Sequence, residues 1–99
     1  MEITETRILL VRNSDSAVRA YASIVLDNCF VVRGLKIISD SKGLFISMPS
    51  RKRPDGKFQD IAHPINNNTR LIIENTILEE YNRVLDSELN METKRIWIE

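Results

Sequence analysis

Positively charged side chains crowd into one short stretch of the chain. Arg51, Lys52, Arg53 and Lys57 fall within seven positions, and the turn sequence Pro54-Asp55-Gly56 lies before the last of them. Guanidinium and ammonium groups contact phosphates, and an arginine can also hydrogen-bond the edge of a guanine. The stretch is therefore a candidate nucleic-acid contact. The alternative is a solvated loop whose charges keep the protein in solution or meet another protein.

Arg70 is the fifth candidate for this contact. A helix is predicted to begin near Thr69, so Arg70 would lie in its first turn and project from the same end of the domain as the basic loop. The N–H groups of a first helical turn also favour anions. Because the formal net charge of the chain is +0, attraction to polyanions must come from a local patch such as this one.

The other reactive side chains do not assemble into a catalytic or metal-binding set. His63 is the only histidine and Cys29 the only cysteine, whereas a structural zinc site needs four ligands. Asp60 could pair with His63 as an acid–base couple, but residues three apart in an extended segment point to opposite sides. A structural His63, whose ring binds the backbone of the turn before Pro64, is the better interpretation. Cys29 is predicted to be a small core residue. We therefore expect no enzymatic activity, no metal, no cofactor and no small-molecule substrate.

Strand patterns dominate the first half of the chain. Alternating or continuous apolar residues predict strands over 3–11, 17–27, 29–39 and 44–48. Short turns join these segments, so the sheet is expected to be antiparallel. The turn Asp27-Asn28 suits a two-residue hairpin, because both residues tolerate positive φ.

Gly34 interrupts the third predicted strand. A glycine there indicates a bulge or a close backbone approach. Strict alternation through the strand places Val31 on the same face as Leu35 and Ile37, and Val32 on the opposite face.

The segment after the fourth strand is predicted to be a basic loop over 49–57. A short strand returns over 58–62, with Phe58 and Ile61 as candidate anchors. Asn66 and its neighbours supply N-cap residues for a helix.

That helix is predicted to run from about residue 69 to residue 85. An apolar stripe with helical spacing supports it: Ile73, Ile77, Tyr81 and Val84. The acidic tail 86–99 is expected to be either a short extra strand or a mobile tail, with Trp97 available to dock on a partner.

These elements predict an α+β domain: an antiparallel sheet of four to five strands followed by a C-terminal α-helix. The length of 99 residues fits one domain, with a folded region over 1–85 and a variable acidic tail over 86–99. One helix of about four turns covers only a portion of such a sheet. We therefore expect a homodimer in which sheets pack or pair across a two-fold axis.

The N-terminal residues lack a basic region followed by an apolar core, so no signal peptide is expected. No apolar run approaches the ~18 residues of a membrane span. A single cysteine excludes an intramolecular disulfide, which suits a reducing compartment. These features favour the cytoplasm.

Several motifs carry a family resemblance. Gly43-Leu44-Phe45, Met48-Pro49-Ser50, Pro54-Asp55-Gly56 and the run DIAHPIN over 60–66 resemble the SpoVG family (stage V sporulation protein G, a septation protein). The resemblance covers residues 1 to about 83.

The resemblance implies a small cytoplasmic bacterial regulator without enzymatic activity. Members are dimers of an antiparallel sheet with a C-terminal helix, and they bind DNA, and RNA in some cases, to influence septation, sporulation and gene expression. The family's binding residues include a Lys-Arg pair after Pro-Ser, which Arg51 and Lys52 match in inverted order. Arg53 replaces a residue that is usually uncharged, and Lys57 stands where an acidic one is common, so the preferred nucleic-acid sequence should differ.

A second hypothesis belongs to another functional class. The chain would be a protein-interaction module for cell-division or regulatory partners, and its nucleic-acid binding would be incidental. The basic loop or the tail with Trp97 would then engage the partner protein.

Overall fold

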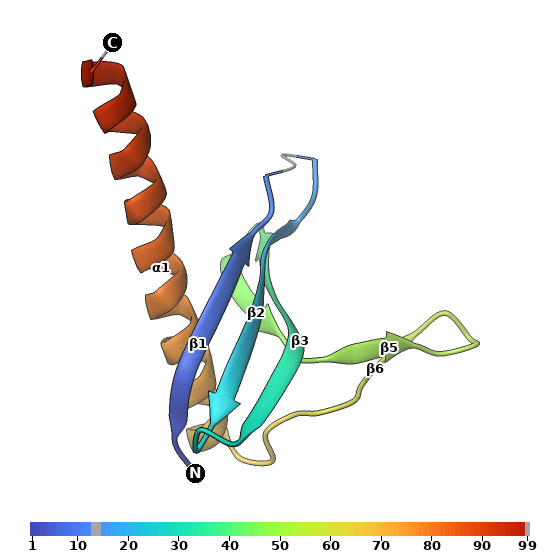
Figure 1. The fold of residues 1–99 in the computed structure, drawn as a ribbon. Coiled ribbons are helices and arrows are strands. Elements are labelled where there is room, and N and C mark those ends of the chain that lie inside the picture. The colour runs from blue at the N-terminus through green and yellow to red at the C-terminus, as the bar shows by residue number, and fades with distance from the viewer. Residues whose placement is uncertain (13–14, 99) are drawn as a thin grey trace.

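A four-stranded antiparallel sheet lies at the centre of the chain (Figure 1). The computed structural model describes residues 1–12 and 15–98. The strands neighbour one another in sequence order: β1 (Ile3–Leu10), β2 (Val18–Leu26), β3 (Phe30–Asp40) and β4 (Gly43–Ser47). This arrangement, with one long helix behind it, confirms the predicted α+β fold.

One face of this sheet is covered by the helix α1 (Asn67–Ile98). The alternation of β2 buries Ala20, Ala22 and Ile24 on that face. Alanine side chains at the middle of the sheet leave room for bulky neighbours, and the fully buried Ile37 and Ile77 fill it. Burying one such isoleucine contributes roughly 1.5–3 kcal/mol. The rest of the buried core comes from β3, β4, the residue after β4, and α1: Leu35, Ile46, Met48, Ile73 and Tyr81.

A tight turn of three residues, 27–29, joins β2 to β3 and is one residue longer than predicted. Asp27 and Asn28 have φ values of 51° and 55°, as predicted, and the Cys29 N–H donates to the Leu26 carbonyl at 3.0 Å. Two successive positive φ values match the right-handed twist of the flanking strands. Cys29 therefore ends the turn and is exposed, so its predicted place in the core is wrong.

A β-bulge at Arg33–Gly34 changes the alternation of β3. Gly34 has a φ of 85°, and the register between β2 and β3 shifts beside it. An extra residue at a bulge reverses the face that each later side chain occupies. Val32 consequently lies on the same face as Leu35, and the predicted grouping of Val31 with Leu35 is wrong.

The helix α1 begins where the N-cap residues predict and continues much further than expected. The Asn66 side-chain oxygen accepts the Thr69 N–H at 2.7 Å, which caps the first turn. The helix has 32 residues and ends at Ile98, so the predicted helix end near residue 85 and the predicted extra strand after it are wrong. No glycine or proline follows Pro64, and nothing else in the sequence stops the helix.

The far half of α1 is tied to the sheet by an ion pair. The Arg12 guanidinium, just after β1, donates to the Glu88 carboxylate at 2.7 Å. Within the described residues of the chain, no helix combines the length and apolar composition that crossing a bilayer requires.

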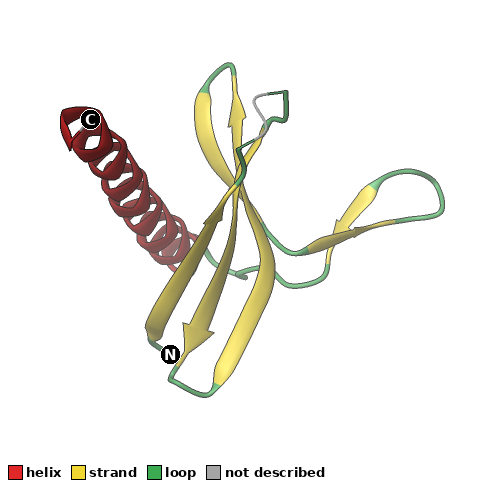
Figure 2. Ribbon diagram, turned by 45° about the horizontal axis from the view of Figure 1, so that its top comes forward, coloured by secondary structure: helices red, strands yellow, loops and turns green. Residues whose placement is uncertain are grey.

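A second, two-stranded sheet projects from the first one. Strands β5 (Ser50–Lys52) and β6 (Phe58–Asp60) pair with each other, and we call residues 50–60 the arm. Figures 1 and 2 show the arm extending from the end of β4, away from α1. The returning strand is confirmed, but residues 50–52 form a strand where a loop was expected.

Phe58 and Ile61 do not anchor this segment. Their exposed fractions are 69% and 66%, because no described part of the chain forms a second layer over the arm. The prediction of two anchors is therefore wrong.

Candidate nucleic-acid interface

The register of the arm sorts its charged side chains onto two faces. Arg51 lies opposite Gln59, and the Arg53 N–H donates to the Lys57 carbonyl at 2.7 Å. Residues directly opposite each other in an antiparallel pair share a face, and successive residues alternate. Arg51, Arg53, Lys57 and Gln59 therefore share one face, which we call the basic face.

The other face of the arm is amphipathic. Lys52 lies opposite Phe58, and Ser50 lies opposite Asp60. The cluster of four cations in the sequence is therefore divided, with three on the basic face and Lys52 beside an exposed phenylalanine. The carboxylate of Asp60 on this second face offsets the charge of Lys52.

A tight turn holds the tip of the arm. The Gly56 N–H donates to the Arg53 carbonyl at 3.0 Å, and Gly56 adopts a φ of 86°. The Asp55 side chain accepts the Lys57 N–H at 3.0 Å. Asp55 also lies 3.5 Å from the Arg53 guanidinium, so it offsets some of the charge on the basic face. Both partners are half-exposed, and such pairs contribute little to stability.

The base of the arm is closed by backbone hydrogen bonding. The Ile61 N–H donates to the Pro49 carbonyl at 2.6 Å. Every residue from Arg51 to Asp60 is exposed. The cations of the arm therefore keep their hydration and are accessible to a large anionic ligand.

Arg70 is not grouped with the arm. It lies in the first turn of α1, where its N–H donates to the Asn66 carbonyl at 3.2 Å. In Figures 1 and 2 the tip of the arm points away from the start of α1. Arg70 and the basic face are thus two separate positive sites.

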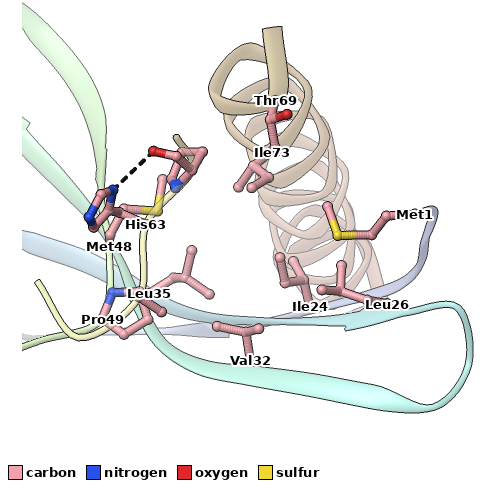
Figure 3. Close-up of a pocket in the computed structure, with 12 residues that line it drawn as sticks. Met1, Ile24, Leu26, Val32, Leu35, Met48, Pro49, His63, Thr69 and Ile73 are labelled. Atoms are coloured by element: carbon pink, nitrogen blue, oxygen red, sulfur yellow. Dashed lines mark hydrogen bonds between the residues drawn. The ribbon is translucent and has the colours of Figure 1, made fainter. Parts of the chain in front are cut away.

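His63 has a structural environment. Its ring Nδ1–H donates to the Pro64 carbonyl at 3.0 Å (Figure 3). The ring thus bonds local backbone as predicted, but the acceptor is Pro64 itself and not the turn before it. The ring borders a cavity of about 180 Å³ beneath the start of α1, and apolar side chains such as Leu35, Met48 and Ile73 form most of its lining. Among the residues described, no group of three or more His, Cys, Asp or Glu side chains could hold a metal ion.

Sequence reasoning missed one exposed surface. The sheet face that points away from α1 carries Tyr21 and Phe45, which are 45% and 42% exposed. We call it the open face. The alternation of residues 17–27 contained this signal, since Tyr21 falls on the side opposite the buried alanines. The bulge in β3 concealed which neighbouring residues join it.

Comparison of the sequence with known proteins shows the family to which the chain belongs. The family model described as SpoVG matches residues 1–83. The chain belongs to the SpoVG family. This confirms the resemblance carried by the motifs between Gly43 and Asn66, and the match includes the whole arm.

Relatives of the SpoVG family from distant bacteria share half of their residues with this chain. A protein of Bdellovibrio bacteriovorus named "Putative septation protein SpoVG" is 52% identical over 87 residues, 88% of this chain and 79% of the relative. The protein of the same name from Bacillus velezensis is 51% identical, with 89% and 90% covered. The one from Anaeromyxobacter sp. (strain Fw109-5) is 54% identical, with 86% of each chain covered.

Proposed function

We propose that this SpoVG-family chain binds nucleic acid through its arm and acts as a regulatory protein of the bacterial cytoplasm. The ligand would be DNA, and RNA as well, and the processes would be septation, sporulation and gene expression. The names of the relatives support the connection to septation. The observation that carries the proposal is an arm free of the body, with Arg51, Arg53 and Lys57 on one face.

The shape of the arm suits a duplex. The major groove of B-DNA, roughly 12 Å wide, admits a two-stranded β-ribbon. With the basic face turned towards the groove, Arg51 and Arg53 could reach base edges, and Lys57 near the tip could contact phosphates. Each phosphate neutralised releases counterions, so the affinity would fall steeply as salt increases.

The test is a gel-shift titration of a DNA duplex at about 50 mM and 200 mM salt. The triple variant Arg51→Gln/Arg53→Gln/Lys57→Gln should lose roughly 100-fold in affinity at low salt. The slope of log affinity against log salt should become shallower by about 0.9 for each of the three side chains that contacts a phosphate.

Single variants provide the controls and test the remaining predicted residues. Lys42→Gln removes an exposed charge from the β3–β4 turn and should leave binding unchanged. Lys52→Gln and Arg70→Gln test two residues away from the basic face, where we expect losses of about 3-fold or less. Unchanged affinity of the triple variant would show that the arm is not the site.

A protein-interaction module is the second candidate, favoured by the exposed Phe58 and Ile61. In that case the arm would present its apolar side chains to a division or regulatory protein. Phe58→Ser would then abolish partner binding, while salt would have little influence on it. Under the nucleic-acid proposal, Phe58→Ser leaves duplex binding nearly unchanged.

We also propose that the chain is a homodimer without enzymatic activity. The outer strands β1 and β4 each have one edge unpaired within the four-stranded sheet, and such an edge can pair with a second copy. Light scattering on the purified chain tests this, since a mass of one chain, 11.5 kDa, at micromolar concentration would contradict it.

A further inference from the structure

The open face combines aromatic and basic side chains in neighbouring rows. Tyr21 lies between Leu9 of β1 and Lys36 of β3 in the register of the sheet. Phe45 of β4 lies on the same face, since its neighbour Ile46 is buried on the other. The two aromatic rings are thus half-exposed on a rigid sheet, and Lys36 lies on the strand between theirs.

The charges of this face are mainly positive. Arg7, Arg33 and Lys36 lie on it, together with two carboxylates. Glu5 has its Oε1 3.3 Å from the Arg7 Nε, and Asp40 lies at the end of β3, two residues beyond the partner of Phe45. Arg7 and Arg33 line the same shallow hollow of about 250 Å³ together with Tyr21. An aromatic ring can stack on a flat ligand, and guanidinium groups beside it can bind the negative charges of the same ligand.

The bulge in β3 lies close to the base of the arm. A Cβ at Gly34 would lie 3.6 Å from the Cβ of Pro49, the last residue before the arm. The bulge that exposes Arg33 is therefore beside the point where the arm leaves the sheet.

We propose that the open face binds a single-stranded segment of nucleic acid. Tyr21 and Phe45 stack on unpaired bases, and Arg7, Arg33 and Lys36 contact the phosphates. The inference deepens the proposed function and rests on it in one respect, because the strand would continue from a duplex or hairpin held by the arm. The chain would thus recognise a junction between paired and unpaired nucleotides.

The shape and charge of the face favour this ligand over two others. A broad sheet does not enter the groove of a duplex, and aromatic rings stack only on bases that are already unpaired. A second copy docked face to face would meet a surface with the same excess of positive charge, and surfaces of like charge oppose association.

The experiment compares two probes with the full chain. A labelled oligothymidylate of about 15 nucleotides and a duplex of equal length are titrated with the wild type, Tyr21→Val and Tyr21→Phe. Valine keeps strand propensity but lacks a ring, whereas phenylalanine keeps the ring. We expect Tyr21→Val to lose roughly 10-fold in affinity for the single strand, Tyr21→Phe to lose nothing, and duplex affinity to stay the same in both.

The arm variants separate this inference from the proposed function. The triple arm variant should lose duplex affinity and retain binding of the oligothymidylate. If the arm variant keeps its duplex affinity while Tyr21→Val still loses the single strand, the arm proposal fails and the open-face proposal stands. If Tyr21→Val binds the oligothymidylate as the wild type does, the open-face proposal fails.

A measurement on the wild type does not depend on the folding of any variant. Nuclear magnetic resonance of the chain titrated with the oligothymidylate should show upfield shifts of the Tyr21 and Phe45 ring protons. Absence of binding, or shifts confined to the arm, overturns the proposal. Light scattering of Tyr21→Val adds one more outcome: dissociation of a dimer by this substitution would assign the open face to a second copy instead.

Discussion

The arm and the body of sheet and helix differ in what their side chains contribute. In the body, Ile37 and Ile77 are fully buried between the sheet and α1. In the arm, every residue from Arg51 to Asp60 is exposed. An isolated two-stranded hairpin is marginally stable in water, and this one is held by its turn and by the bond to Pro49. Packing therefore fixes the conformation of the body, whereas binding of a ligand can fix the conformation of the arm.

The largest expected effect tests this difference directly. Ile77→Ala should lower the free energy of unfolding by about 3 kcal/mol, because it leaves a cavity in the core. Phe58→Ala in the arm should change it by less than about 0.5 kcal/mol. Urea denaturation of both variants measures the contrast. A comparable loss from Phe58→Ala would mean that the arm packs on the body.

Two glycines with the same backbone geometry make a matched pair. Gly34 and Gly56 have φ values of 85° and 86°, where an alanine is strained by about 1–2 kcal/mol. Gly34→Ala should lower the free energy of unfolding by that amount, since the strain falls within the body. Gly56→Ala should leave global unfolding unchanged and weaken duplex binding, because the arm can open without the body. Urea denaturation and gel shifts measure the two quantities, and equal destabilisation would refute the separation.

A smaller effect concerns the charge of the basic face. Asp55→Asn keeps an oxygen that can accept the Lys57 N–H, so the turn should persist. It removes the negative charge 3.5 Å from the Arg53 guanidinium. We expect duplex affinity to rise about 3-fold with stability unchanged, as gel-shift titration and urea denaturation would measure. Weaker binding would indicate that Asp55 itself contacts the ligand.

The smallest effect lies in the body. Replacing Arg12 and Glu88 with alanine, singly and together, should give a coupling of about 0.5 kcal/mol, the size expected of an exposed ion pair. A double-mutant cycle from urea denaturation measures it. A coupling near zero at low salt would mean that this pair does not fasten α1 to the end of β1.

The sequence predicted the elements whose signals are local. The alternation around Ala20 and Ala22, the positive φ of Asp27 and Asn28, and the cap at Asn66 each depend on a few neighbouring residues. The two faces of β3 could not be predicted because they depend on the register, which one extra residue at Gly34 reverses. Cys29 is exposed because it belongs to the turn and not to the strand.

The sequence predicted the cluster of charges at the candidate site, but not the β-hairpin that carries them or their division between its two faces. Strands of three residues, such as β5, are too short to show any periodicity, so the hairpin looked like a loop. The division of the cations follows from which residue lies opposite which, as with Lys52 and Phe58, and composition carries no such information. The length of α1 was underestimated because the acidic residues after Leu85 were taken for a tail, although these residues are compatible with a helix.

The backbone hydrogen bonds from Ile61 and Ala62 to the Pro49 carbonyl, which close the base of the arm, have a consequence for engineering. Because the residues between Pro49 and Ile61 contribute almost nothing to the core, the arm can be exchanged as a cassette. Transplanting the arm of a relative between Pro49 and Ile61 should transfer the relative's ligand preference to this scaffold. The body would then serve as a constant support on which different specificities can be compared.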